Sequence, residues 1–237
     1  MKLKNTLLLL ILFFNVSIVF SQNGYAYYKK QLSYVDDKSK NEYMKQALKH
    51  LKTQEYELSF HKNNALFKKV EALSVENNPV VEAFTKSISG FSGEAYFDRA
   101  KKTIIHKKEF AGSSFLILKK NTNWVLTRET LKIDNYLCYK ATTTTSIENS
   151  EGIHEVVVIA WYAPEISLPY GPDGYGELPG LILKLENNGI ITTLSKIEFL
   201  NAKTIEISPP TKGQEITEEA FSEMVKKRFQ NRKGDSN

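Results

Sequence analysis

Residues 160–185 have the sequence AWYAPEISLPYGPDGYGELPGLILKL, and this stretch decides the fold that we predict for the chain. It contains four prolines and four glycines, and it continues directly into the alternating leucines that begin at Leu181. Each proline fixes φ and removes a backbone donor, whereas glycine permits conformations that are closed to other residues. We therefore predict a rigid, irregular crossing between two strands, in which Pro179 and Gly180 form a type II turn into the second strand.

The segments on both sides of this crossing have the pattern of β-strands. Residues 154–161 are nearly continuous in apolar β-branched residues, which is typical of a strand covered on both faces. Asn187, Asn188 and Gly189 give the strongest hairpin signal, because Asn and Gly tolerate positive φ, and residues 190–200 form the return strand. Alternation and β-propensity predict further strands at residues 24–34, 56–60, 96–97, 103–106, 115–118, 124–126, 136–145 and 204–207.

Two segments have the period of an amphipathic helix. Within residues 36–51, apolar side chains recur every four residues, and Asp36 or Asp37 is a suitable cap. Within residues 216–232, Thr217 is a natural cap, and the helix has an apolar stripe. The stripe consists of Phe221, Met224, Val225 and Phe229. Residues 70–92 contain the Asn78-Pro79 break, and we predict a loop there.

These elements predict one mainly β domain. We expect a strongly curved antiparallel sheet or a partial barrel, with one helix after the first strand and another at the C-terminus. The concave face of such a sheet resembles that of the lipoprotein-carrier half-barrels, which is an analogy at the level of the fold.

The first residues have the pattern of a signal peptide. Lys2 and Lys4 precede an apolar run over residues 6–20, which is short for a membrane-spanning helix. We expect cleavage after Ser21, so that residues 1–21 are removed and residues 22–237 form a single domain; an uncleaved anchor is the alternative. The expected location is the periplasm or the exterior, without a later membrane-spanning segment.

The sequence lacks the common motifs of catalytic, nucleotide and metal sites. It has no P-loop, GxGxxG, HExxH, GxSxG or EF-hand pattern. The four histidines are scattered, so we expect neither a metal nor a cofactor. The basic residues are spread along the chain, apart from a run near the C-terminus, and no nucleic-acid partner is expected. The lone Cys138 is interpreted as a buried, inert thiol.

The crossing contains the residues that are candidates for ligand or partner contact. Its aromatic side chains would either form a contact platform or cap the sheet core. Its two acidic residues would serve a hydrolase if they lay close together, or else accept backbone hydrogen bonds in turns. The candidates are Trp161, Tyr162, Tyr170, Tyr175, Glu165 and Asp173, together with Lys140, whose surroundings bear on the same question.

Four segments resemble, in their order and spacing, the GLPGLI family of secreted or periplasmic Bacteroidota proteins of unknown function. They are residues 136–142 (YLCYKAT), 160–166 (AWYAPEI), 171–172 (GP) and 178–182 (LPGLI). The chain departs from the family at two places. Glu177 stands where the family's motif begins with Gly, and residues 156–159 stand where the family often has a Gly-Arg pair. The resemblance implies no activity. The motif residues that we interpret as structural are Pro164, Pro172, Leu178, Pro179, Gly180, Leu181 and Ile182.

Three functions are compatible with this pattern. The favoured one is an exported, non-enzymatic binding or carrier module for an apolar or peptide ligand. The alternative is a structural or assembly module that contacts envelope proteins through the proline-rich segment and the C-terminal helix. A hydrolase that uses Glu165 and Asp173 is less favoured, and no catalytic residue is assigned.

Overall fold

A computed structural model describes residues 23–34, 41–61, 63–71, 78–119, 121–149, 152–200 and 205–234. The predicted signal peptide lies outside these residues.

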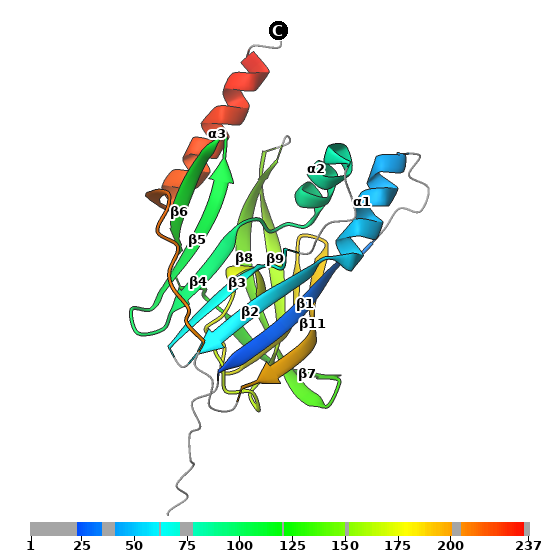
Figure 1. The fold of residues 1–237 in the computed structure, drawn as a ribbon, viewed down its shortest axis with the longest axis vertical. Helices are drawn as coiled ribbons and strands as arrows, with labels where there is room; N and C mark the ends of the chain where they lie inside the picture. The colour runs from blue at the N-terminus through cyan, green and yellow to red at the C-terminus, as the bar shows by residue number, and fades with distance from the viewer. Residues whose placement is uncertain are drawn as a thin grey trace, which may run out of the picture.

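A twelve-stranded sheet dominates the described part of the chain (Figure 1). Its order is β12-β6-β5-β4-β3-β2-β1-β11-β10-β9-β8-β7, and the sheet does not close on itself. The strands are β1 (Gly24–Leu32), β2 (Glu55–His61), β3 (Asn64–Lys69), β4 (Glu94–Asp98), β5 (Thr103–Phe110), β6 (Ser113–Lys119), β7 (Val125–Ile133), β8 (Tyr136–Asn149), β9 (Gly152–Ala163), β10 (Leu181–Asn187), β11 (Ile190–Phe199) and β12 (Gln214–Thr217). Every pairing is antiparallel except that of β12 with β6.

The mainly β prediction is confirmed, together with both predicted helices. The helices are α1 (Glu42–Thr53), α2 (Pro79–Ile88) and α3 (Glu218–Gly234), and η1 (Pro172–Gly174) is a single 3-10 turn. α1 begins later than predicted, because the side chain of Asn41 caps it by accepting from the Met44 N–H at 3.1 Å. Asp36 and Asp37, the predicted caps, lie outside the described residues.

The predicted loop over residues 70–92 is wrong, because it contains α2. Asn78 accepts from the N–H groups of Val80 and Val81 at 3.0 and 3.4 Å, and Pro79 occupies the first turn. Proline suits this position because its missing N–H would have no partner inside the helix. The Asn-Pro break therefore marks the start of a helix. α2 packs on α1, where the Thr85 hydroxyl donates to the Ala47 carbonyl at 3.4 Å.

Two turn predictions have opposite outcomes. The hairpin between β10 and β11 is confirmed, with Asn188 and Gly189 at φ values of 47° and 75°. The type II turn at Pro179-Gly180 is wrong: Gly180 has a φ of 159°, far from the value near +80° of such a turn. A Cβ at Gly180 would overlap the carbonyl of Ala163, so a close approach of two backbones requires glycine here. The described part of residues 204–207 forms no strand.

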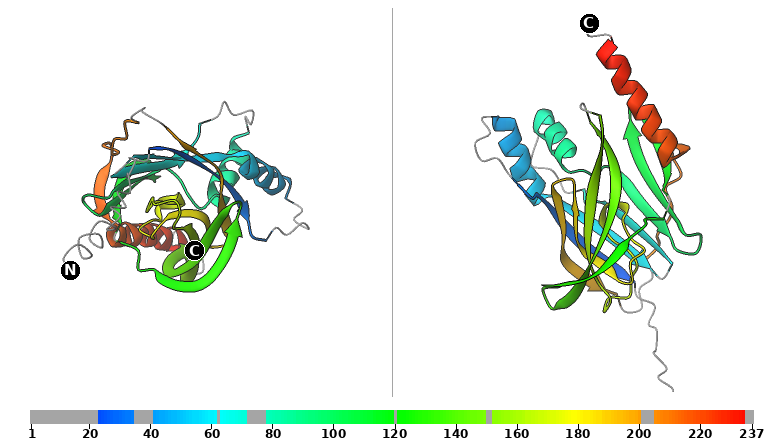
Figure 2. Two further views of the ribbon diagram at one scale, coloured as in Figure 1. Left: turned by 90° about the horizontal axis from the view of Figure 1, so that it is seen from below. Right: turned by 180° about the vertical axis from the view of Figure 1, so that it is seen from behind.

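The sheet curves strongly, and the crossing lies inside the curve. Figure 2 shows this segment, in yellow, surrounded by the strands. Ile166, Leu168 and Tyr170 of the crossing belong to the same buried cluster as aromatic residues of β1–β4. Those aromatic residues are Tyr28, Tyr56, Phe60, Phe67 and Phe97. At one end of the sheet, α3 packs Phe221 against Phe110 and Phe115, with ring centroids 5.7 and 5.5 Å apart.

Candidate functional site

The crossing, residues 164–180, folds onto the concave face, and we call it the plug. Its backbone hydrogen-bonds partly to itself, since the Glu177 N–H donates to the Pro169 carbonyl at 2.9 Å. It also bonds to the strand that follows, where the Ile182 N–H donates to the Tyr170 carbonyl at 3.0 Å. The plug is therefore an ordered part of the core, which places its side chains at fixed positions inside the sheet.

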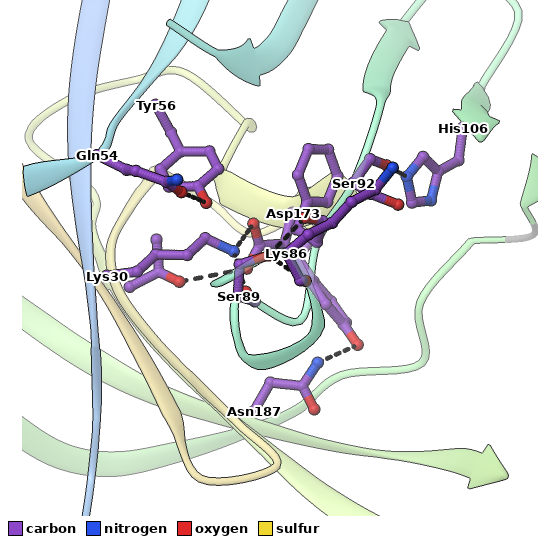
Figure 3. Close-up of polar contacts among 12 residues, drawn as sticks. Lys30, Gln54, Tyr56, Lys86, Ser89, Ser92, His106, Asp173 and Asn187 are labelled. Carbon is purple, nitrogen blue, oxygen red and sulfur yellow. Dashed lines mark hydrogen bonds and ion pairs between the residues drawn. The ribbon is translucent and has the colours of Figure 1, made fainter. Parts of the chain in front are cut away.

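A buried ion pair joins the plug to the sheet (Figure 3). Lys30 Nζ of β1 lies 2.7 Å from Asp173 Oδ1, and the two side chains are 0% and 10% exposed. The same ammonium donates to the Ser89 carbonyl at 3.0 Å, directly after the end of α2. Lys30 thus joins three parts of the fold: the first strand, the end of α2 and the plug.

Backbone geometry and strand register bring Asp173 to this position. Asp173 has a φ of 59°, which is uncommon for a residue other than glycine and carries strain. Its Oδ2 accepts from the Thr192 hydroxyl at 3.2 Å. Thr192 is the direct partner of Lys30 across β1 and β11, so the two side chains lie on the same face of the sheet.

Aromatic rings surround the ammonium. Lys30 Nζ lies 4.7 Å from the ring centroid of Tyr56 and 5.3 Å from that of Phe91. Burial lowers the pKa of Lys30, while Asp173 opposes this shift through its charge and hydrogen bond. The ion pair is thus held in an apolar setting in which an unpaired charge would be costly.

His106 lies beside this group but carries no charge near neutral pH. Its ring stacks on Phe91 with centroids 5.0 Å apart, and its Nε2 lies 2.9 Å from the Ser92 carbonyl. Burial, the largest cause, and the charges of nearby lysines lower its pKa to about 3, although the hydrogen bond with the Ser92 carbonyl opposes this shift. His106 is therefore neutral and serves the packing of the core.

The structure separates the aromatic residues that the sequence singled out. Tyr162, Tyr170 and Tyr175 are buried in the core, with exposed fractions of 6%, 2% and 7%. Trp161 is half-buried and lies on the face of β9 opposite to its neighbour Tyr162, together with its cross-strand partner Lys140. It packs against the buried cluster that contains Tyr170, whereas Tyr162 and Tyr175 belong to a second cluster. These four side chains do not share one surface.

The polar candidates also lie in different surroundings. Lys140 forms an ion pair with Glu129 at 3.0 Å, away from Asp173. Glu165 is exposed at the start of the plug, whereas both oxygens of Asp173 are engaged by Lys30 and Thr192. Asp173 is thus held by a cation and a hydroxyl. The hydrolase hypothesis requires instead that Asp173 be paired with a second carboxylate.

The motif residues are mostly buried, and the backbone at Glu177 has a conformation that glycine prefers. Pro172, Leu178, Leu181 and Ile182 are buried, as is Gly180, whereas Pro164 and Pro179 are exposed. Glu177 has a φ of 66°, in the left-handed region that favours glycine. Its carboxylate accepts from the Thr122 N–H at 3.0 Å, and Trp124 Nε1 donates to the neighbouring Gly176 carbonyl at 2.9 Å.

Sequence reasoning missed Lys30, Ser89 and Thr192. One signal could have found Lys30: it follows Ala26 and Tyr28 at alternating positions of the first strand, so it belongs to the inward face. Ser89 and Thr192 have no comparable signal, because their roles depend on contacts between distant segments.

The described residues contain no group of three or more His, Cys, Asp or Glu side chains that could hold a metal ion. Within the same parts of the chain, none of the helices has both the length and the apolar character needed to cross a membrane.

Comparisons with known proteins show a similarity in fold to solved structures and a partial match to a family of unknown function. The model of a family described as "Protein of unknown function (Porph_ging)" matches residues 148–184, which include the plug. No protein with a curated description matches. Two solved structures of PNGF-II, in space groups C2 and P21, are similar with TM-scores of 0.52 and 0.51 at 13% and 14% sequence identity.

The likeness to PNGF-II covers 86% of this chain but 33% of PNGF-II, so the chain spans about a third of that protein's length. At such low identity the likeness shows the fold alone. The family match is consistent with a Bacteroidota-type family of unknown function, and the narrower assignment to the GLPGLI family stays a prediction.

Proposed function

We propose that the chain is an exported, non-enzymatic carrier for an apolar ligand, and that the present structure is its closed state. In this state the plug occupies the place of the ligand on the concave face. The observation that carries the proposal is the position of Lys30, which binds both Asp173 of the plug and the Ser89 carbonyl at the end of α2.

The chemistry of the ion pair favours a role in fixing the position of the plug over a role in simply stabilising the fold. Removing two charges from water costs free energy that their attraction only partly returns, so well-packed apolar residues often stabilise a core as well or better. A buried pair does confine the plug to one arrangement, because any displacement leaves both charges unpaired. A ligand that supplied a partner for Lys30 would offset this cost.

The lining of the concave face indicates the class of ligand. Displacement of the plug would uncover an interior rich in aromatic and aliphatic side chains, including Tyr28, Phe67 and Phe97. Lys30 would be a cation at one end of this surface. An acyl chain with a carboxylate head fits both properties, and sites of this kind combine an apolar lining with few polar groups.

Binding of dodecanoate and of the dye N-phenylnaphthylamine tests the proposal. Asp173→Asn removes the charge while keeping the size of the side chain, so we expect the dye to bind more tightly to this variant than to the wild type. Dodecanoate should displace the dye from both. Lys140→Met is the matched control, because it breaks the exposed pair with Glu129 and should leave dye binding unchanged. If neither folded protein bound the dye or dodecanoate, the proposal would be wrong.

The other two functions have less support. Most of the proline-rich segment lies in the interior, which leaves α3 and the strand edges as contact surfaces for an assembly module. A hydrolase using Glu165 and Asp173 would require Asp173 to leave Lys30 and Thr192.

A further inference from the structure

The strand β8 extends beyond its neighbour β7. β9 pairs with β8 as far as Asn149, but the pairing of β7 with β8 ends where Val125 lies opposite Thr142. Residues 143–149 of β8 are therefore not paired with β7, and we call this segment the upper β8 edge. Such an edge presents backbone donors and acceptors at every second residue.

An open hollow of about 380 Å³ lies next to this edge, within the size range of ligand sites. Val125 and Val157 on its rim are 65% and 60% exposed, which is high for valine. The hollow thus combines apolar walls with hydroxyl groups and a strand edge. Its lining residues are Asn123, Val125, Thr142, Thr143, Thr144 and Val157.

The edge of β7 differs from the upper β8 edge in features that prevent strand addition. The register of β7 against β8 shifts between Leu126 and Thr130, which is a bulge, and the bulged segment contains Arg128 and Glu129. Bulges and charged side chains protect exposed edges from pairing with other chains. In contrast, residues 143–146 of the upper β8 edge are three threonines and a serine, uncharged and favourable for extended structure, and Glu148 is the one charged residue of this edge.

We propose that the upper β8 edge binds an extended segment of a partner protein as an additional antiparallel strand, in line with β7. Every second side chain of this segment would enter the hollow, where Val125 and Val157 favour Val, Ile or Leu. The backbone edge selects a polypeptide over a free apolar molecule, because only a strand satisfies a row of backbone donors and acceptors.

The hollow side of this surface faces away from the proposed carrier site. On the hollow side, Thr144 pairs directly with Val157, and Thr142 pairs with Ile159. On the other face, Ala141 pairs with Ala160, and this row of cross-strand partners continues through Leu185 and Thr192 to Lys30. Alternate residues of a strand point to opposite faces, so Thr142 and Thr144 face away from the plug. The hollow and the plug therefore lie on opposite faces of β8, although Thr145 of the same edge hydrogen-bonds with Tyr175 of the plug on the inner face. The peptide assay and the dodecanoate assay test the two proposals separately.

Peptide binding to the full chain tests the proposal. The probes are fluorescently labelled eight-residue peptides with Val, Ile or Leu alternating with Thr or Ser, flanked by lysines for solubility. Each peptide has a partner of the same sequence that is N-methylated at every second residue, which removes the donors of one strand edge. Fluorescence anisotropy measures the affinity for the wild type and for Val157→Lys. Val80→Lys, on the exposed surface of α2, is the matched control.

We expect at least one sequence to bind, with N-methylation and Val157→Lys each weakening the affinity by about tenfold or more. Val80→Lys should bind like the wild type. Equal binding of the methylated and unmethylated peptides would overturn strand addition, and so would the absence of binding by every peptide. A dimer detected by light scattering without peptide, and abolished by Val157→Lys, would instead identify a second copy of the chain as the occupant and overturn the proposed partner.

Discussion

Lys30 Nζ and Asp173 Oδ1 lie 2.7 Å apart, although 143 positions separate the two residues in the sequence. The contact connects the first strand of the sheet to the most irregular segment of the chain, and it lies in an interior that is otherwise largely apolar. The position of the plug inside the curved sheet therefore depends on an electrostatic contact as well as on packing.

Replacing one residue of the Lys30–Asp173 ion pair should destabilise the fold more than replacing both. We expect Lys30→Met to lower the free energy of unfolding by about 3–5 kcal/mol, because Asp173 is left as a buried, unpaired charge. The double variant Lys30→Met, Asp173→Asn should recover much of this loss. Urea unfolding followed by circular dichroism measures both. Equal losses in the single and the double variant would show that the charge pairing is unimportant.

Glu177→Gly should stabilise the protein. The φ of 66° at this position costs a residue with a Cβ about 1 kcal/mol, which glycine avoids. Glu177→Ala separates this effect from the loss of the contact to the Thr122 N–H, because alanine keeps the strain and lacks the carboxylate. The unfolding free energy of the glycine variant should exceed that of the alanine variant. The reverse order would contradict the assignment of strain.

Gly180→Ala should destabilise the turn that leads into β10. The new Cβ would overlap the backbone of Ala163, and forced overpacking costs about 1–3 kcal/mol. Gly112→Ala is the control, because Gly112 also has a positive φ, 82°, but a Cβ there meets nothing within 4 Å. Thermal unfolding of the two variants should show the larger decrease in Tm for Gly180→Ala. Similar decreases in Tm would mean that the positive φ, and not the close approach of the two backbones, is what disfavours a side chain at position 180.

Acid should weaken the fold through His106. Its folded-state pKa is about 3 and its ordinary value is 6.5, so the unfolded chain binds the proton first as the pH falls. Stability should therefore decrease from about pH 6.5 towards pH 3. His106→Phe preserves the stacking on Phe91 and removes the titrating group. Its unfolding free energy should depend less on pH over this range, and an unchanged dependence would exclude His106 as the cause.

Local patterns predicted much of the fold. Alternation, hairpin residues and helical period identified most strands, the Asn188-Gly189 turn and the helices α1 and α3, because each signal lies within a few neighbouring residues. α2 was missed although its signal is local: Asn78-Pro79 was interpreted as a break, whereas the same pair caps and begins a helix.

The candidate site was predicted only in part. The sequence directed attention to Asp173, but its partners Lys30, Ser89 and Thr192 come from three other segments that only the folded sheet brings together. Trp161 and Lys140 were grouped with Asp173 by their place in or near the motif. Strand register puts them on the other face of the sheet from Thr192 and Lys30.

The most direct test of the carrier proposal is hydrogen exchange of the plug with and without dodecanoate. The amides of Glu177 and Ile182 report on the plug, because their hydrogen bonds to Pro169 and Tyr170 hold it in place. If the ligand replaces the plug, these amides should exchange faster when dodecanoate is bound, while amides of the β2–β3 pair stay protected. Binding of dodecanoate with unchanged protection of both amides would contradict the claim that the plug occupies the ligand's place.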